Sequence, residues 1–167
     1  MGRVMKSVVK TLALALATVA IPAAAGAQGV IMERNVSMAL AREIVNAAME
    51  CTKDGAAMSA AVVDRSGEVI ALLRGDGASL YGTELARRKA YTARAFRRPS
   101  LEWAKRTQTD LIGQRSLSQV IPLGGGMPIK VGEETIGAVG VSGTSGGQQG
   151  DEDCAKSAIA KVADQLK

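Results

Sequence analysis

The sequence predicts an α+β domain, in which an antiparallel sheet of five strands carries helices packed on it. Two observations favour this class. The predicted elements follow the order α, β-β, α-α, β-β-β, α, so strands occur in consecutive runs separated by helices. Glycine-containing turns or breaks lie between most of the strands within a run, as in antiparallel hairpins and meanders. The chain shows no internal repeat and no low-complexity segment.

The N-terminal part predicts one helix followed by a β-hairpin. The helix is capped by Asn35 or Ser37 and ends near Gly55. Residues 58–63 and 68–74 are two apolar runs joined by a turn that contains glycine, which is typical of a hairpin. Apolar residues recur at helical spacing and form one face of this helix: Leu40, Ile44, Ala47, Ala48 and Cys51.

The middle of the chain predicts two consecutive helices. Residues 83–98 form the first, with Thr83 as its cap. Pro99 ends it, because the residue before a proline avoids the α conformation. Ser100 is then placed to cap a short second helix at residues 101–107.

The C-terminal part predicts three strands and a last helix. Residues 117–123 form the first strand, and residues 128–131 and 135–142 form a second hairpin. Three glycines at residues 124–126 separate the strand from the hairpin. The last helix begins at Asp151 and ends near Leu166. Its apolar stripe comprises Ala155, Ala158, Ile159, Val162 and Leu166.

The N-terminus has the pattern of a secretory signal peptide, residues 1–27. Its apolar part, residues 11–21, is shorter than the roughly 20 residues of a membrane span, so no span is predicted; a retained anchor is the alternative. Residues 28–167 are expected to form one domain in the periplasm or outside the cell. The net charge of +5 falls to +2 without Arg3, Lys6 and Lys10, which argues against nucleic acid as a partner.

The chain contains no histidine. This excludes Ser-His-Asp triads and any zinc or haem site that depends on a histidine ligand. No acid–base pair stands out, so the residues favour a binding protein over an enzyme and leave catalysis open.

Cys51 and Cys154 are the two cysteines. An even count in an exported protein favours a disulfide, with two free buried thiols as the alternative. If the first and last helices lie side by side on the sheet, these two residues can meet.

A glycine-rich loop at residues 143–150 leads into the last helix and is a candidate anion site. It lacks the lysine of a phosphate-binding P-loop. The acids at 151–153 are predicted at the helix start, where they would repel an anion. A self-capped helix after a flexible loop is therefore the favoured interpretation, and a metal ion on the three acids is a weaker alternative.

The segment from Arg87 to Arg106 is strongly basic, with Glu102 as its one acid. Such a stripe can hold the carboxylates of a small ligand or anionic lipid head groups, and a solvated face with ion pairs is the alternative. Next to Pro99, the segment combines a hydroxyl group with the aromatic rings of Phe96 and Trp103. A flat, apolar ligand with acidic groups would suit this place.

Five stretches in order resemble the GlcG/HbpS-like haem-binding family, the domain of unknown function 336. The resemblance covers nearly all of residues 28–167 and implies a profilin-like domain, homo-oligomers that are commonly octamers built from dimers, and haem binding in some members. Exported members often carry both cysteines. The stretches are SAAVVDRSGEVIALLRGDG (59–77), ELARRKAYTARAF (84–96), PSLEWAKR (99–106), IPLGGGMPI (121–129) and IGAVGVSGTSGGQQGDEDCAKSA (136–158).

The resemblance also implies a haem site in the middle segment. One ligation mode of the family uses the hydroxyl residue directly after the proline, which is Ser100 here and would be the metal ligand. The haem-binding residues expected beside it are Arg94, Arg97, Arg98, Trp103 and Arg106. One alternative is a haem-free accessory or small organic-acid-binding subunit of an exported oxidoreductase or uptake system. Another is a haem-degrading or peroxidase-like enzyme.

Overall fold

The computed structural model describes residues 29–52 and 57–167. The predicted signal peptide, residues 1–27, and the predicted helix stop near residue 55 lie outside the described residues. The chain divides into two units, Met1–Met32 and Glu33–Lys167, and the described helices and strands belong to the second. Within the described part, no helix is both long enough and apolar enough to cross a membrane.

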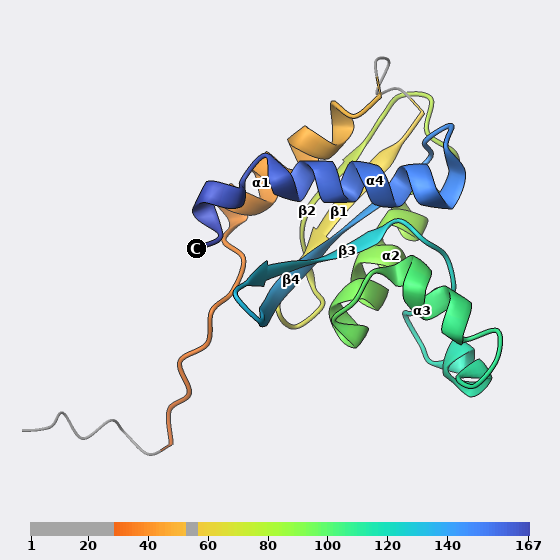
Figure 1. Ribbon diagram of the computed structural model, residues 1–167. Helices are drawn as coiled ribbons and strands as arrows, with labels where there is room; N and C mark the ends of the chain where they lie inside the picture. The colour runs from red at the N-terminus through yellow and green to blue at the C-terminus, as the bar shows by residue number, and fades with distance from the viewer. Residues whose placement is uncertain (1–28, 53–56) are drawn as a thin grey trace, which may run out of the picture. The chain divides into compact units, whose positions relative to one another are not determined.

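An antiparallel sheet forms the centre of the second unit, with the strand order β2-β1-β4-β3 (Figure 1). Both predicted hairpins, β1–β2 and β3–β4, are confirmed, and β1 pairs with β4 to join them. β2 and β3 are consequently the two edge strands. The bounds are β1 (Ser59–Val63), β2 (Val69–Arg74), β3 (Gly126–Val131) and β4 (Glu134–Ser142).

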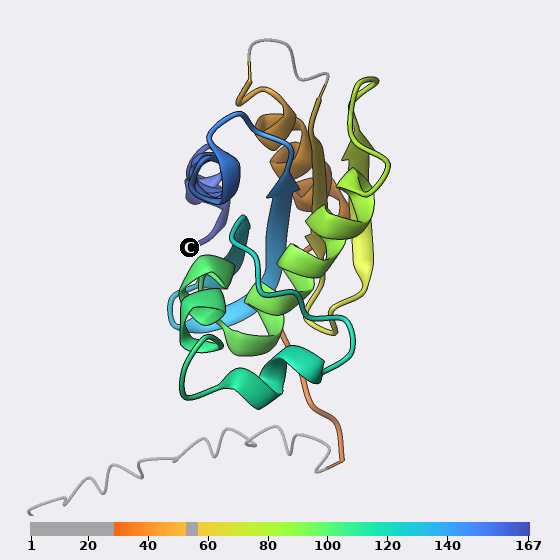
Figure 2. The ribbon, with the colours of Figure 1, turned by 90° about the vertical axis from the view of Figure 1, so that its right-hand side faces the viewer.

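Helices cover both faces of this sheet. α1 and α4 pack against each other on one face, and α2 lies on the other (Figure 2). The α+β class with helices packed on an antiparallel sheet is therefore confirmed. In the described part of the chain the helices are α1 (Met38–Met49), α2 (Gly82–Phe96), α3 (Ser100–Arg106) and α4 (Gly147–Ala160), with two 3-10 turns, η1 (Ile112–Ser116) and η2 (Ala163–Gln165).

The sheet has four strands in the described residues, so the prediction of five was wrong. The strand predicted at residues 117–123 does not form; the chain there follows η1, which ends at Ser116, and runs through a turn and an irregular stretch. Side chains of α2 make hydrogen bonds with the backbone of residues 120–121, in place of a neighbouring strand. Thr92 Oγ1 accepts a hydrogen bond from Ile121 N at 2.9 Å, and the Arg88 guanidinium donates to the Val120 carbonyl. Backbone groups paired in this way need no neighbouring strand.

One predicted helix start is confirmed, whereas the boundaries of α2 and α4 differ from the predicted ones. α1 begins as one alternative predicted, because Ser37 Oγ accepts a hydrogen bond from Leu40 N at 3.2 Å. α2 has Tyr81 rather than Thr83 at its cap position, and no side chain caps it. α4 begins at Gly147, four residues before the predicted start at Asp151, and ends at Ala160. The three acids of α4 therefore lie beyond its first turn.

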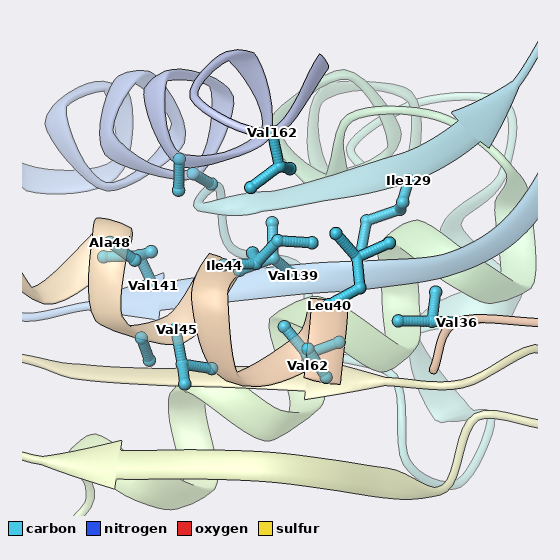
Figure 3. Packing of buried hydrophobic residues seen from close by; sticks show 14 of the residues in the cluster. Val36, Leu40, Ile44, Val45, Ala48, Val62, Ile129, Val139, Val141 and Val162 are labelled. Atoms are coloured by element: carbon cyan, nitrogen blue, oxygen red, sulfur yellow. The ribbon is translucent and has the colours of Figure 1, made fainter. Parts of the chain in front are cut away.

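The main core lies between the sheet and the pair α1 and α4 (Figure 3). Ile44 of α1 and Val139 of β4 are fully buried at its centre. The predicted disulfide between Cys51 and Cys154 is present, with the two Cα atoms 5.6 Å apart. It fixes the chain just beyond α1 to the middle of α4, as expected for two helices that lie side by side.

α2 lies very close to the opposite face of the sheet. Gly126 of β3 and Gly140 of β4 are directly paired, and a Cβ atom at either would overlap the backbone of α2. The absence of side chains at these two positions allows the backbone of α2 to pack directly against the strands. This close approach brings Lys89 of α2 next to the glycine segment at residues 124–126.

Candidate functional site

The predicted haem-binding segment lies at the junction of α2 and α3. Arg97 ends α2 in the left-handed conformation, with φ of 55°, and Pro99 precedes the first turn of α3. Phe96 and Trp103 stack across the junction, with ring centroids 4.6 Å apart and planes inclined by 19°. Trp103 is 1% exposed, and its indole N–H donates to Gln114 Oε1 at 2.9 Å. Trp103 therefore holds the junction together, and Phe96 covers it.

Ser100 is completely buried at the start of α3. Its hydroxyl donates to the Leu123 carbonyl and accepts from Gly126 N, both at 2.8 Å. These two bonds fasten α3 to the chain that enters β3. Ligation of a metal by Ser100 would require this buried hydroxyl to become accessible, which means separating α3 from the chain that enters β3.

The predicted arginines fall into two groups. Arg94 is half-buried at the end of α2, and its Nε atom is buried without a hydrogen-bond partner among the described residues. Burial lowers the pKa of Arg94, and the nearby positive charges of Arg65 and Arg97 lower it further. Arg94 and Arg97 therefore form a cationic site, and the nearby carboxylates of Asp64 and Glu33 offset part of its charge.

The second group follows the surface of α3. Arg98 pairs with Glu102 at 2.8 Å, one helical turn away. Arg106 lies 4.0 Å from Asp110, and both are solvent-exposed. Exposed pairs of this kind contribute little to stability, about 0–1 kcal/mol. A ligand can therefore replace the acidic partners of these two arginines with little loss of folding stability.

Lys89 and Asp151 form a buried ion pair that the sequence analysis did not identify. Lys89 Nζ lies 2.6 Å from Asp151 Oδ2 and also donates to the Val141 carbonyl at 3.1 Å. The side chains of Lys89 and Asp151 are 3% and 7% exposed. Asp151 Oδ1 accepts from both the backbone N–H and the hydroxyl of Thr144. The pair thus connects α2, the end of β4 and α4.

The glycine segment at residues 124–126 leaves room for this ion pair. Gly125 has φ of 120°, and a Cβ there would lie 2.8 Å from Asp151 Cβ and 3.1 Å from Lys89 Cδ. Asp151 turns inward to the lysine instead of facing an anion at the helix start. No group of three or more cysteine or acidic side chains in the described residues is arranged to hold a metal ion.

The spacing of buried residues along each helix indicates that Lys89 and Asp151 are both buried. Lys89 lies three residues after Ala86 and four before Ala93, which are both fully buried. Asp151 lies three and four residues before Cys154 and Ala155, which are buried as well. A charged residue on each of two apolar faces suggests a partner across the core, because an isolated buried charge is very costly.

Glu152 connects α4 to the start of α3. Its carboxylate accepts a hydrogen bond from Leu101 N at 3.1 Å, in the first turn of α3. Burial raises the pKa of Glu152 above its ordinary value of 4.5, although backbone hydrogen bonds oppose this effect.

We expect Glu152→Gln to raise the stability at neutral pH and to weaken its dependence on pH. As the pH rises from 4.5 toward the folded-state pKa, the unfolded chain loses its proton before the folded chain does, so wild-type stability falls across that window. The glutamine has no charge to desolvate, and its amide oxygen can still accept from Leu101 N. Urea unfolding at pH 4 and pH 7 should show a stability difference that grows with pH; a constant difference would contradict this account.

Comparisons with known proteins agree with this fold. A double mutant of HbpS from Streptomyces reticuli has a crystal structure with 32% identity and a TM-score of 0.77, covering 86% of this chain and 97% of that one. The PduOC:haem complex has 29% identity and a TM-score of 0.66, covering 75% and 93%.

One curated relative is an uncharacterised 15.0 kDa protein of Citrobacter freundii, from the dhaT-dhaS intergenic region. It is 35% identical over 86 residues, which span 49% of this chain and 61% of the relative. The family model described as "Haem degrading protein HbpS-like" matches residues 36–160, most of the chain. This protein therefore belongs to the HbpS-like family, the domain of unknown function 336.

Proposed function

We propose that this protein binds haem at the α2–α3 junction and acts in haem carriage, storage or sensing outside the cytoplasm. The observation that carries the proposal is the similarity to a domain solved as a haem complex, within a family described by haem chemistry. The junction is the proposed location because it presents arginines beside an aromatic pair.

The residues at the junction fit the carboxylates of haem better than its iron. Arg94 and Arg97 supply positive charge, and the Arg94 Nε–H has no hydrogen-bond partner in the described structure. Arg98, which is half-exposed and precedes α3, and Arg106, which is exposed at its end, add guanidinium groups. Haem supplies two carboxylates and an iron that needs an axial ligand. Ser100 is the proposed ligand, at the cost of its hydrogen bonds to Leu123 and Gly126.

The proposed location outside the cytoplasm rests on two features. The predicted signal peptide, residues 1–27, directs export. The disulfide between Cys51 and Cys154 is of a kind that persists in oxidising compartments and is rare in the cytosol.

A haem titration followed by the Soret band tests the proposal. We expect a saturable shift for the wild type and an affinity about tenfold weaker for Arg97→Ala, the loss of one charge-assisted contact. Arg42→Ala, an exposed arginine on α1, is the matched control and should bind as the wild type does. A wild-type spectrum identical to that of free haem would refute haem binding.

Ser100→Ala tests the proposed iron ligand independently of the arginines. The variant should lose about 1–3 kcal/mol of stability, because Leu123 O and Gly126 N lose their partner. Its spectrum is therefore compared only under conditions where circular dichroism shows a folded chain. An unchanged Soret position would remove Ser100 as the ligand and leave the arginine site standing.

A second candidate is a haem-free subunit that binds a small organic acid. The observations that favour it are the absence of histidine and the complete engagement of the Ser100 hydroxyl. The cationic site of Arg94 and Arg97 would then hold a carboxylate without iron. Thermal shifts with dicarboxylates but none with haem would select this function over the first.

A further inference from the structure

Helix α4 is bonded to both segments that bury the Ser100 hydroxyl. On the α3 side, the Glu152 carboxylate accepts a hydrogen bond from Leu101 N at 3.1 Å, and Leu101 directly follows Ser100. On the β3 side, Gln148 Oε1 accepts from Gly124 N at 2.7 Å. Gly124 lies in the chain between the two backbone partners of the Ser100 hydroxyl. α4 therefore holds together the two segments that must separate before Ser100 can reach a ligand.

Gln148 and Glu152 act side by side, and we call these two residues the α4 clamp. They are four residues apart on α4, so they lie on the same face of the helix. A Cβ atom on Gly124 would lie 2.9 Å from Leu101 Cβ and 3.2 Å from Gln148 Cβ. The missing side chain at Gly124 therefore lets α3, α4 and the chain entering β3 meet at one point.

Two attachments of α4 to the rest of the fold fix the position of the clamp. Asp151, one residue before Glu152, forms the buried ion pair with Lys89. Cys154, two residues after Glu152, forms the disulfide with Cys51. An opening at Ser100 therefore has to break the hydrogen bonds of the clamp, because α4 is held in place on both sides of Glu152.

The clamp lies closer to solvent than the group that it covers. Ser100 is completely buried, whereas Glu152 is half-buried and Gln148 is exposed. Hydrogen bonds near the surface break in local openings that require less free energy than unfolding of the core. Water or a ligand therefore reaches the clamp before it reaches the Ser100 hydroxyl.

We propose that the α4 clamp controls access to Ser100, and that its release lets α3 separate from the chain entering β3 and frees the hydroxyl. The inference rests on the proposed function, in which Ser100 is the iron ligand. Arg97 and Arg106 are exposed while the clamp is closed, so the closed protein offers an acidic ligand the arginines alone. The apparent affinity for haem is then reduced in proportion to the fraction of molecules with an open clamp.

Amide hydrogen exchange of the haem-free protein tests whether Ser100 is uncovered by a local opening. Gly126 N donates to Ser100 Oγ, so its exchange reports on the covering of that hydroxyl. Gly126 should exchange faster than Val139, which is fully buried in the interior strand β4, and its rate should depend less on urea. Equal rates and equal urea dependence would overturn the proposal, because Ser100 would then be uncovered only by global unfolding.

A pair of neutral variants tests the role of the clamp in that opening. Glu152→Ala and Glu152→Gln both remove the charge, but only glutamine keeps an oxygen that can accept from Leu101 N. Gly126 should therefore exchange about tenfold faster in Glu152→Ala than in Glu152→Gln. Lys156→Ala, an exposed residue one turn further along α4, is the control and should keep the wild-type rate. Equal rates in the two Glu152 variants would remove Glu152 from the clamp.

A haem titration followed by the Soret band tests the consequence for the ligand. Glu152→Ala should bind haem about tenfold more tightly than Glu152→Gln, because a larger open fraction raises the apparent affinity. A purely structural role would not tighten binding. Faster exchange without tighter binding would overturn control of haem access. A wild type that leaves the spectrum of free haem unchanged refutes the proposed function instead, and the exchange rates still decide whether the clamp covers Ser100.

Discussion

Asp151→Ala is expected to lower the free energy of unfolding by about 3–5 kcal/mol, the range for breaking a buried ion pair by removal of one partner. The substitution leaves the Lys89 ammonium buried with only the Val141 carbonyl as acceptor. It also removes the acceptor of two hydrogen bonds from Thr144. Both interactions are lost where α2, β4 and α4 meet, so the substitution is expected to destabilise the whole domain and not one loop.

Urea unfolding followed by the fluorescence of Trp103 measures this effect. Trp103 is the one tryptophan of the chain and is 1% exposed, so its emission reports on the folded core. Asp153→Ala is the matched control, because this acid lies on the same helix and is exposed. It should change the stability by no more than about 0.5 kcal/mol.

A double variant separates the charge from the packing. Lys89→Met alone leaves the Asp151 carboxylate buried without its cation. Lys89→Met with Asp151→Asn removes both charges and keeps an oxygen that can accept from Thr144. The double variant should therefore be more stable than Lys89→Met alone. If it is less stable, packing around Gly125 accounts for the loss and the ion pair does not.

Local patterns predicted the parts of the fold that depend on neighbours in sequence. The hairpins β1–β2 and β3–β4 follow from apolar runs with a glycine turn between them. The helix α1 follows from its spacing and from the Ser37 cap. The strand predicted at residues 117–123 failed for a non-local reason. Arg88 and Thr92, distant in sequence, bond the backbone that a fifth strand would have used.

The same distinction applies to the candidate site. The sequence identified the junction around Ser100 and its arginines, because hydroxyl, aromatic and basic residues lie close together in the chain. It did not show that Ser100 is buried with both hydrogen bonds made, since Leu123 and Gly126, at the entry to β3, are more than twenty residues away. The sequence placed Lys89 in a basic stripe and Asp151 at an acidic helix start for the same reason. The two residues are far apart in the chain, and only the folded structure shows that they form a buried ion pair.

Reduction of the disulfide is expected to lower the free energy of unfolding by about 4–5 kcal/mol. Cys51 and Cys154 are separated by 103 residues, and opening a loop of that length releases much conformational entropy in the unfolded chain. The midpoint of urea unfolding should fall when dithiothreitol is added to the wild type. The variant Cys51→Ser with Cys154→Ala should start at the lower midpoint and show no response. Equal wild-type midpoints with and without the reductant would contradict the prediction.

The two largest losses should add, because they act on different states. Asp151 and Cys154 lie one turn apart on α4, and the ion pair holds that helix to α2 while the disulfide holds it to the end of α1. Breaking the ion pair destabilises the folded state, whereas reduction mainly frees the unfolded state. Their sum, about 7–10 kcal/mol, is comparable to the total stability of a typical domain, about 5–15 kcal/mol. Reduced Asp151→Ala should therefore unfold at a much lower urea concentration than the oxidised variant, which keeps a measurable unfolding transition.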